Sequence, residues 1–133
     1  MKRIGITQRL EREEKFGEIR NSLDIRWQKL LLSLDLIPLP IPIKTDFSLY
    51  ANLDLDGIIL TGGNDLSSQS NNFLSELRDK HEIECIQFAI KNSIPLLGVC
   101  RGMQLIAEYF CSSFKKVDNH VAKRHHLVSV NDH

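Results

Sequence analysis

The stretch 96-LLGVCRGMQL-105 carries a cysteine between two glycines, where a run of apolar residues gives way to helical composition. A nucleophile elbow is a strand that turns abruptly into a helix with the nucleophile on the turn, and its strained backbone requires small neighbours on both sides. Gly98 and Gly102 meet that requirement around Cys100. The stretch therefore predicts a buried strand, a sharp turn that presents a thiol, and a helix.

Two features favour the reactive thiolate form of Cys100. A thiol at a helix N-terminus lies at the positive end of the helix dipole, and Arg101 adds a charge nearby. The alternative is a small buried hydrophobe, which is the common fate of a free cysteine. We expect that fate for Cys85 and Cys111, which fall in helical segments without turn glycines.

The segments around the elbow predict an α/β fold. Apolar runs flanked by turn residues are typical of strands in a parallel sheet, whereas a run with three prolines suits an edge strand because proline donates no ladder hydrogen bond. Residues 9–17 are charged and punctuated by glycine, which predicts a loop. The predicted strands are 3–7, 36–43 (the proline-rich edge), 56–63 and 94–100, and the predicted helices are 18–34, 73–92 and 101–110.

The order of these elements implies parallel strands joined by crossover helices, which is a flavodoxin-like sheet sandwiched by helices. Residues 125–133 alternate like a further strand, yet no helix follows them. We therefore expect residues 1–133 to form a single domain that is C-terminally incomplete.

Two of the predicted strands end in candidate functional groups, and ligands of open parallel sheets bind beyond the carboxyl ends of the strands. One strand ends at Cys100 and the other at the turn Thr61-Gly62-Gly63. One interpretation of the glycine pair is a tight turn without a further role. Beside a nucleophile, its N–H groups can instead stabilise an oxyanion together with the N–H of Arg101.

Composition limits the remaining classes of function. The 133 residues include 17 basic and 17 acidic side chains, so there is no electrostatic footprint for nucleic acid. No apolar run is long enough for a signal peptide or a membrane span, which predicts a cytoplasmic protein without a membrane partner. Three cysteines without C-x-x-C spacing argue against a disulfide framework and a zinc site.

Three motifs in combination resemble the class I glutamine amidotransferase superfamily, in particular its gamma-glutamyl hydrolase-like branch. They are DGIILTGGNDL (56–66), RDKHE (78–82) and PLLGVCRGMQLI (95–106). The opening GITQR and the segment EIRNSLDIRW are further similar to members of that branch that act on a gamma-glutamyl nucleoside diphosphate amidate in capsule phosphoramidate synthesis. The resemblance covers nearly the whole chain.

The resemblance implies a cysteine hydrolase of small gamma-glutamyl substrates that uses no metal or organic cofactor. In that family Cys100 would attack a gamma-glutamyl amide carbonyl, form a thioester and release glutamate to water. The matching oxyanion donors are the turn Gly62–Gly63, with Gly63 preferred, and Arg101. Gln104 matches a residue that contacts the gamma-glutamyl group, and Arg9 is a candidate for binding a phosphate in the leaving group.

One departure from the family pattern matters for activity. The family supplies a general base and its orienting carboxylate as an H-x-E pair downstream of the elbow, and no H-x-E occurs in this chain. Three of the histidines that follow the elbow, His120, His125 and His126, resemble a segment that precedes that pair in the family. His81 lies next to Glu82, which predicts a place on a solvated helix face.

Two explanations stay open, a truncated piece of a longer hydrolase or a degenerate domain that binds without catalysis. The alternative functions are accordingly the glutaminase module of an amidotransferase and a non-catalytic flavodoxin-like binding domain. A truncated domain would expose apolar surface, which makes a homo-oligomer a further expectation.

Overall fold

The computed structural model of the 133-residue chain describes residues 1–115. Its main sheet contains β1 (Lys2–Thr7), β4 (Leu36–Ile41), β5 (Gly57–Leu60) and β6 (Leu96–Gly98). All neighbours in the order β4-β1-β5-β6 are parallel, and β1 lies between β4 and β5. This arrangement confirms the predicted α/β, flavodoxin-like fold.

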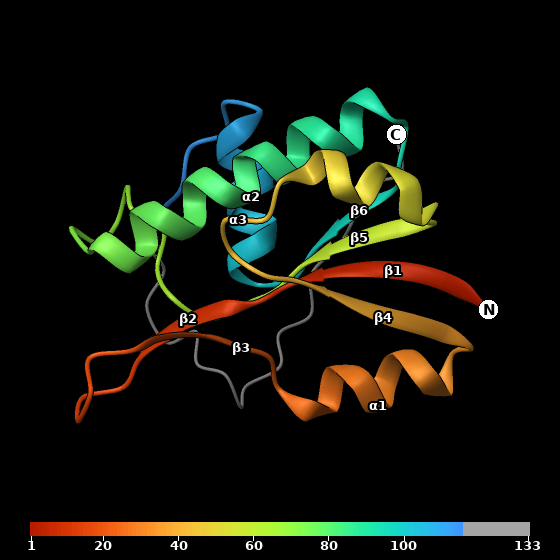
Figure 1. Cartoon of the computed structure of the whole chain (residues 1–133). Coiled ribbons are helices and arrows are strands. Elements are labelled where there is room, and N and C mark those ends of the chain that lie inside the picture. The colour runs from red at the N-terminus through yellow and green to blue at the C-terminus, as the bar shows by residue number, and fades with distance from the viewer. Residues whose placement is uncertain (116–133) are drawn as a thin grey trace, which may run out of the picture.

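Helices cover both faces of the sheet, as Figure 1 shows. One face carries α1 (Ile25–Ser33), and the other carries the 3-10 helix η1 (Phe47–Leu53), α2 (Phe73–Lys91) and α3 (Arg101–Tyr109). Each face has its own core. The core under α1 contains Ile4, Ile6, Leu31 and Ile59, and the core on the other face contains Ile41, Phe47, Leu55, Ile58, Leu60, Leu66, Cys85, Ile86, Ala89 and Leu105.

The strand rich in proline lies at the edge of the sheet, as its sequence predicts. β4 pairs only with β1 among the described strands, and Pro38 and Pro40 lie opposite Ile4 and Ile6. The central strand β5 is buried at all four positions, which fits its continuous apolar sequence.

The predicted loop at 9–17 is wrong in part, because β2 (Arg9–Arg12) and β3 (Ile19–Ser22) form an antiparallel hairpin. The predicted first helix is also too long at its start. Residues 18–24 are not helical and include β3 and the helix cap Asp24, whose side chain accepts a hydrogen bond from the Arg26 N–H. The hairpin extends from the sheet at the carboxyl end of β1 (Figure 1).

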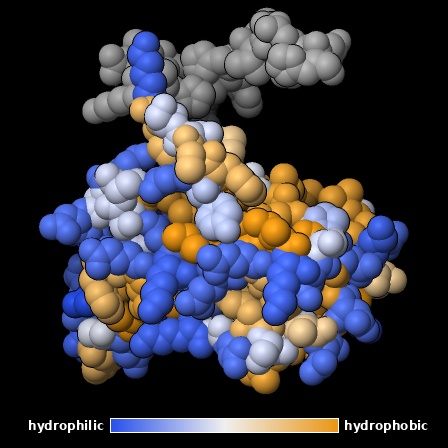
Figure 2. All heavy atoms as spheres, turned by 90° about the horizontal axis from the view of Figure 1, so that it is seen from above, coloured by the Kyte–Doolittle hydropathy of each residue, from blue (hydrophilic) through white to orange (hydrophobic). Residues whose placement is uncertain are grey.

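The outer face of η1 and α2 is mixed in polarity. In Figure 2 a band of hydrophilic side chains crosses this face and hydrophobic side chains lie beside it. Within residues 1–115, no helix combines the length and the apolar character that crossing a bilayer requires. The strand predicted at 125–133 lies outside the described residues.

Candidate functional site

Cys100 lies on a strained turn between β6 and α3. Its backbone angles are φ 54° and ψ −109°, which a residue with a side chain rarely adopts, and its thiol is free and exposed. The two flanking glycines are required sterically. A Cβ at Gly98 would lie 2.5 Å from the Met103 nitrogen, and a Cβ at Gly102 would overlap the Leu60 carbonyl oxygen.

The turn after β5 lies directly beside the thiol. A Cβ at Gly62 would lie 3.3 Å from the Cys100 Cβ and 3.8 Å from its Sγ. Gly63 has a φ of +79°, and the Arg9 side chain packs against it, with Cδ 2.8 Å from the place of a Cβ. The structure thus brings together four of the predicted residues, Cys100, Gly62, Gly63 and Arg9.

Arg78 of α2 fixes the conformation of this turn from the buried side. Its Nη2 donates to the Thr61 carbonyl (2.8 Å), and its Nη1 donates to the carbonyls of Gly62 (2.9 Å) and Gly63. Nη1 also reaches Asn64 Oδ1 at 3.1 Å. The side chain is fully buried, and this desolvation lowers the pKa of the guanidinium.

A cluster of four buried charges joins Arg78 to the elbow. Glu82 accepts hydrogen bonds from Arg78 Nε (3.0 Å), from Arg101 Nη1 and from the Thr7 hydroxyl (2.7 Å). Asp79 accepts from Arg101 Nη2 and from the backbone N–H of Ser67. The Arg101 charge is therefore paired inside the protein, which differs from its predicted role as a free charge beside the thiol.

Gln104 and Arg9 border the elbow and the turn. Gln104 is half-buried one helical turn after Cys100, and its N–H donates to the Cys100 carbonyl at 3.1 Å. Arg9 is exposed on β2, where its guanidinium pairs with Glu11 at 2.6 Å. Gln104 thus follows the nucleophile along α3, and Arg9 lies against the glycine turn with its guanidinium in an exposed ion pair.

Asn64 attaches the hairpin to the glycine turn. Its amide accepts from the Leu10 N–H at 3.0 Å and donates to the Leu10 carbonyl at 2.9 Å. Its backbone has a positive φ of 54°, which asparagine tolerates better than most residues. Sequence reasoning assigned no role to Asn64 or Thr7, and the sequence signals available were the motifs TGGND and GITQR that contain them.

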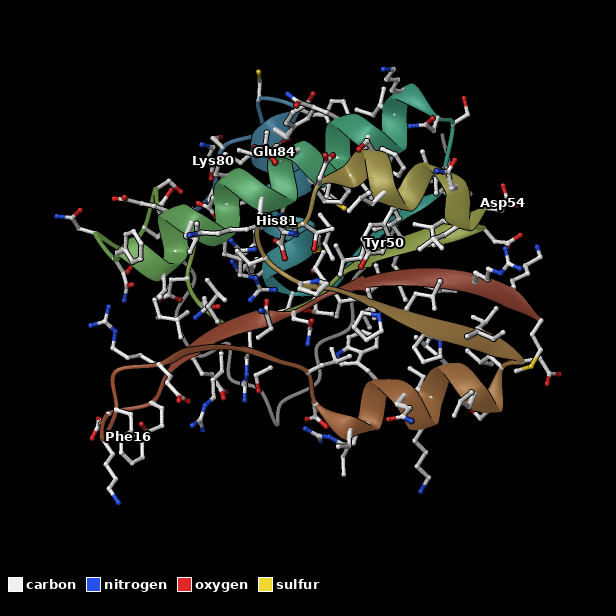
Figure 3. The ribbon with its side chains drawn as sticks, in the orientation of Figure 1. Phe16, Tyr50, Asp54, Lys80, His81 and Glu84 are labelled. Atoms are coloured by element: carbon white, nitrogen blue, oxygen red, sulfur yellow. The ribbon has the colours of Figure 1, made fainter. Side chains whose placement is uncertain are left out.

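The predicted place of His81 on a solvated face is wrong. His81 is only 3 % exposed and its ring stacks on Phe47 with 5.0 Å between the ring centroids. Figure 3 shows His81 beneath α2, on the side of the sheet, while Lys80 and Glu84 project from the outer side of the helix. Desolvation lowers the pKa of His81.

The other cysteines differ from Cys100 and from each other. Cys85 is buried in the core, and burial raises the pKa of its thiol, so the expectation of a small buried hydrophobe is confirmed. Cys111 is exposed and follows the end of α3, with a φ of 63°, so the same expectation is wrong there. Within residues 1–115, no group of His, Cys, Asp and Glu side chains could hold a metal ion.

Known proteins resemble this chain over much of its length. The model of the family Peptidase C26 matches residues 3–131. Gamma-glutamyl-CDP-amidate hydrolase of Campylobacter jejuni is 45 % identical over 123 residues, which are 90 % of this chain and 61 % of that protein. A glutamine amidotransferase-like protein of Lactococcus lactis is 38 % identical over 82 residues, which are 56 % of this chain and 34 % of that protein.

A relative from a different functional class also matches. One component of the glutamine-hydrolysing GMP synthase of Methanococcus maripaludis is 28 % identical over 95 residues, which are 71 % of this chain and 43 % of that protein. The chain thus spans less than two thirds of the length of these relatives. The match to the family model over nearly all residues confirms the resemblance to the class I glutamine amidotransferase superfamily, and the chain belongs to the peptidase C26 family.

Proposed function

We propose that this chain carries the nucleophile and oxyanion hole of a hydrolase that cleaves gamma-glutamyl amide linkages and releases glutamate. The observation that carries the proposal is the strained, exposed Cys100 beside the turn Gly62–Gly63. A nucleophile and two sets of backbone N–H groups within one small region are the parts that acyl transfer needs.

The first step is attack of the Cys100 thiolate on the gamma-carbonyl carbon. The new S–C bond places negative charge on the carbonyl oxygen, which the N–H groups of Gly63 and Arg101 stabilise. Collapse of this intermediate breaks the C–N bond, and the amine leaves with a proton from a general acid. Water then cleaves the gamma-glutamyl thioester and releases glutamate, so that one water is consumed in each cycle.

Two side chains are proposed to bind the substrate. Gln104 lies one turn along α3 from the nucleophile, where its amide can hold the gamma-glutamyl group. Arg9 lies against Gly63, where its planar guanidinium suits a phosphate of the leaving group. The name of the Campylobacter jejuni relative, with its CDP-amidate, supports a nucleotide leaving group of this kind.

The general base is proposed to come from outside residues 1–115. His81, the histidine of that part of the chain, is buried against Phe47, and its cavity of about 180 Å³ is lined by Ile43, Lys44, Leu77, Lys80 and Glu84 rather than by the elbow. We accordingly propose that residues 1–133 are part of one glutamine amidotransferase-like domain, whose H-x-E pair completes the catalytic machinery.

The test is selective acylation of Cys100. The chain is incubated with the p-nitrophenyl ester of the glutamate gamma-carboxyl, and the acylated peptide is located by mass spectrometry. We expect one gamma-glutamyl group on Cys100 and none on Cys85 or Cys111. Cys100→Ser should lose the acylation, whereas Cys111→Ser, a change at the other exposed thiol, should retain it. Acylation that is equal at Cys100 and Cys111 would contradict the proposal.

A second candidate is the glutaminase module of an amidotransferase, which the match to the GMP synthase component favours. The two candidates differ in the leaving group, because a glutaminase accepts glutamine and releases ammonia. Competition by glutamine and by a gamma-glutamyl nucleotide amidate against acylation of Cys100 separates them. Protection by the nucleotide amidate at lower concentration than glutamine supports the hydrolase, and the reverse order supports the glutaminase.

A further inference from the structure

The proposed oxyanion hole has two donors, the N–H groups of Gly63 and Arg101. The four buried charges on α2 and α3 are connected to each other and to the residues that carry both donors. Glu82 binds Arg78, which holds the glycine turn, and it also binds Arg101, whose N–H begins α3. The Thr7 hydroxyl adds the end of β1, because it donates to Glu82 and accepts from the Thr61 N–H at 3.1 Å. Glu82 therefore connects the end of β1, the turn after β5 and the start of α3, directly or through one further side chain.

The direction of the carbonyls fixes the direction of the N–H groups. In a trans peptide unit the carbonyl and the following N–H point to opposite sides, and the described residues contain no cis peptide bond. Arg78 draws the carbonyls of Thr61, Gly62 and Gly63 toward itself. The N–H groups that follow them, including that of Gly63, therefore point away from Arg78, and the Gly63 N–H donates to no other residue within 1–115.

We propose that Arg78 is a positioning residue that holds the Gly63 N–H in the direction of the oxyanion. Glu82 links Arg78 to Arg101, which carries the second N–H donor. This inference rests on the proposed function. Arg78 does not touch the reacting atoms in this role, since it acts on the buried side of the turn. Its planar fork supplies five donors in fixed directions, which a lysine cannot reproduce at three carbonyls and a carboxylate together.

The composition of the cluster supports a role beyond stability. Two arginines balance two carboxylates, so the unit carries no net charge, and all four side chains are at least 90 % buried. Apolar residues of similar volume often stabilise a core as well as a buried ion pair does. Both terminal nitrogens of the buried Arg78 donate to one glycine turn, and the geometry that they impose on that turn explains the cluster better than stability does.

The test compares two reactions of Cys100 in the 133-residue chain. Acylation by the gamma-glutamyl p-nitrophenyl ester forms an S–C bond, breaks the ester C–O bond and releases nitrophenolate through an oxyanion intermediate. Alkylation by iodoacetamide also forms an S–C bond but expels iodide and develops no charge on a carbonyl oxygen at the reacting carbon. An effect on the oxyanion hole therefore changes the first rate and leaves the second unchanged.

Arg78→Lys keeps the charge balance of the cluster and loosens the hold on the turn. We expect acylation to slow by about 10- to 100-fold, within the range for a weakened oxyanion donor, while alkylation stays within about twofold. Arg26→Lys, at an exposed arginine of α1, is the matched control and should leave both rates unchanged. An unchanged acylation rate in Arg78→Lys, or an equal fall in both rates, would overturn the inference.

A second pair of variants covers the case in which Arg78→Lys fails to fold. Thr7→Val removes the hydroxyl that joins Glu82 to the Thr61 N–H, whereas Thr7→Ser retains it. We expect acylation to slow by about 3- to 10-fold in Thr7→Val, with alkylation unchanged, and Thr7→Ser to behave as wild type. Equal acylation rates in the two variants would contradict the proposed network. A wild-type chain that is alkylated but not acylated would instead refute the proposed function, and this inference with it.

Discussion

Gly98 and Gly102 show how closely the backbone is packed at the elbow. At Gly102 the space for a side chain is already occupied by the Leu60 carbonyl, and β5 cannot withdraw without losing its pairing with β6. We expect Gly102→Ala to lower the free energy of unfolding by about 3 kcal/mol or more. Urea titration followed by Trp27 fluorescence measures the change.

Gly17 provides the matched control, since it has a φ of +68° with open space where a Cβ would lie. Gly17→Ala should lower the free energy of unfolding by about 1 kcal/mol, because it adds only backbone strain. If Gly102→Ala were no more destabilising than Gly17→Ala, the close approach at the elbow would not exist in solution.

His81 makes the stability of the fold depend on pH. Its pKa in the folded protein lies below the ordinary value of 6.5, mainly through burial, although Glu82 and Glu84 nearby oppose the shift and Arg78 adds to it. The unfolded chain therefore binds more protons than the folded chain below pH 6.5. The free energy of unfolding should be level above that pH and fall by up to about 1.4 kcal/mol for each pH unit below it.

Denaturant unfolding between pH 5 and pH 7.5 measures this dependence. His81→Leu keeps an apolar contact with Phe47 and removes the titrating group, so its stability should be flatter across the same range. A wild-type profile parallel to that of His81→Leu would show that His81 does not titrate differently on folding.

His81 and Arg101, two residues that sequence reasoning misplaced, are titratable or charged side chains that lie buried. RDKHE has the composition of a solvated helix face, and nothing in its periodicity distinguishes Arg78, Asp79 and Glu82 from exposed residues. They are buried because they pair with each other and with Arg101, which lies 19 residues beyond Glu82 in the chain. Long-range pairing of this kind is invisible to a local pattern, whereas the glycines around Cys100 are a local pattern and predicted the elbow correctly.

Among the secondary-structure elements, the hairpin of β2 and β3 depends most on contacts from elsewhere. Its strands expose most of their side chains, and Leu10 is its buried anchor. Strands that gain so little from burial carry no alternating apolar pattern, which is why the sequence predicted a loop at β2 and the start of a helix at β3. The strands 36–43 and 56–63 and the helix 73–92 were predicted within a few residues, because their apolar residues face the core.

The attachment through Asn64 predicts the behaviour of the hairpin. Asn64→Gly keeps the backbone free to adopt a positive φ but removes both hydrogen bonds to Leu10. We expect hydrogen exchange of the hairpin amides to become at least about tenfold faster, since each lost bond is worth about 1 kcal/mol. Asn71→Gly, at an exposed loop residue, is the control and should leave this exchange unchanged. If Asn64→Gly also left it unchanged, the hairpin would be held by its own strand pairing alone.

For the molecule as a whole, we expect Cys100 to be acylated by an activated ester without catalytic turnover of an amide. The nitrophenolate of an activated ester leaves without a proton, whereas the amine of an amide needs one, and the chain contains no H-x-E to supply it. We expect stoichiometric acylation of Cys100 and an amide turnover close to the uncatalysed rate. Robust release of glutamate from a gamma-glutamyl amide, measured by an enzyme-coupled assay, would show that another group of this chain acts as the general acid and base.

The prolines of β4 have a consequence for how the sheet can grow. Pro38 and Pro40 occupy alternate positions of an edge strand, so the N–H groups missing from them are those that would face away from β1. A strand arriving at that side would find no N–H donor at Pro38 or Pro40, and the Pro40 carbonyl already accepts from the Tyr50 hydroxyl at 2.9 Å. The edge is thereby closed to templated addition of another chain, and in the described sheet any additional strand must pair with β6, on the side where the elbow lies.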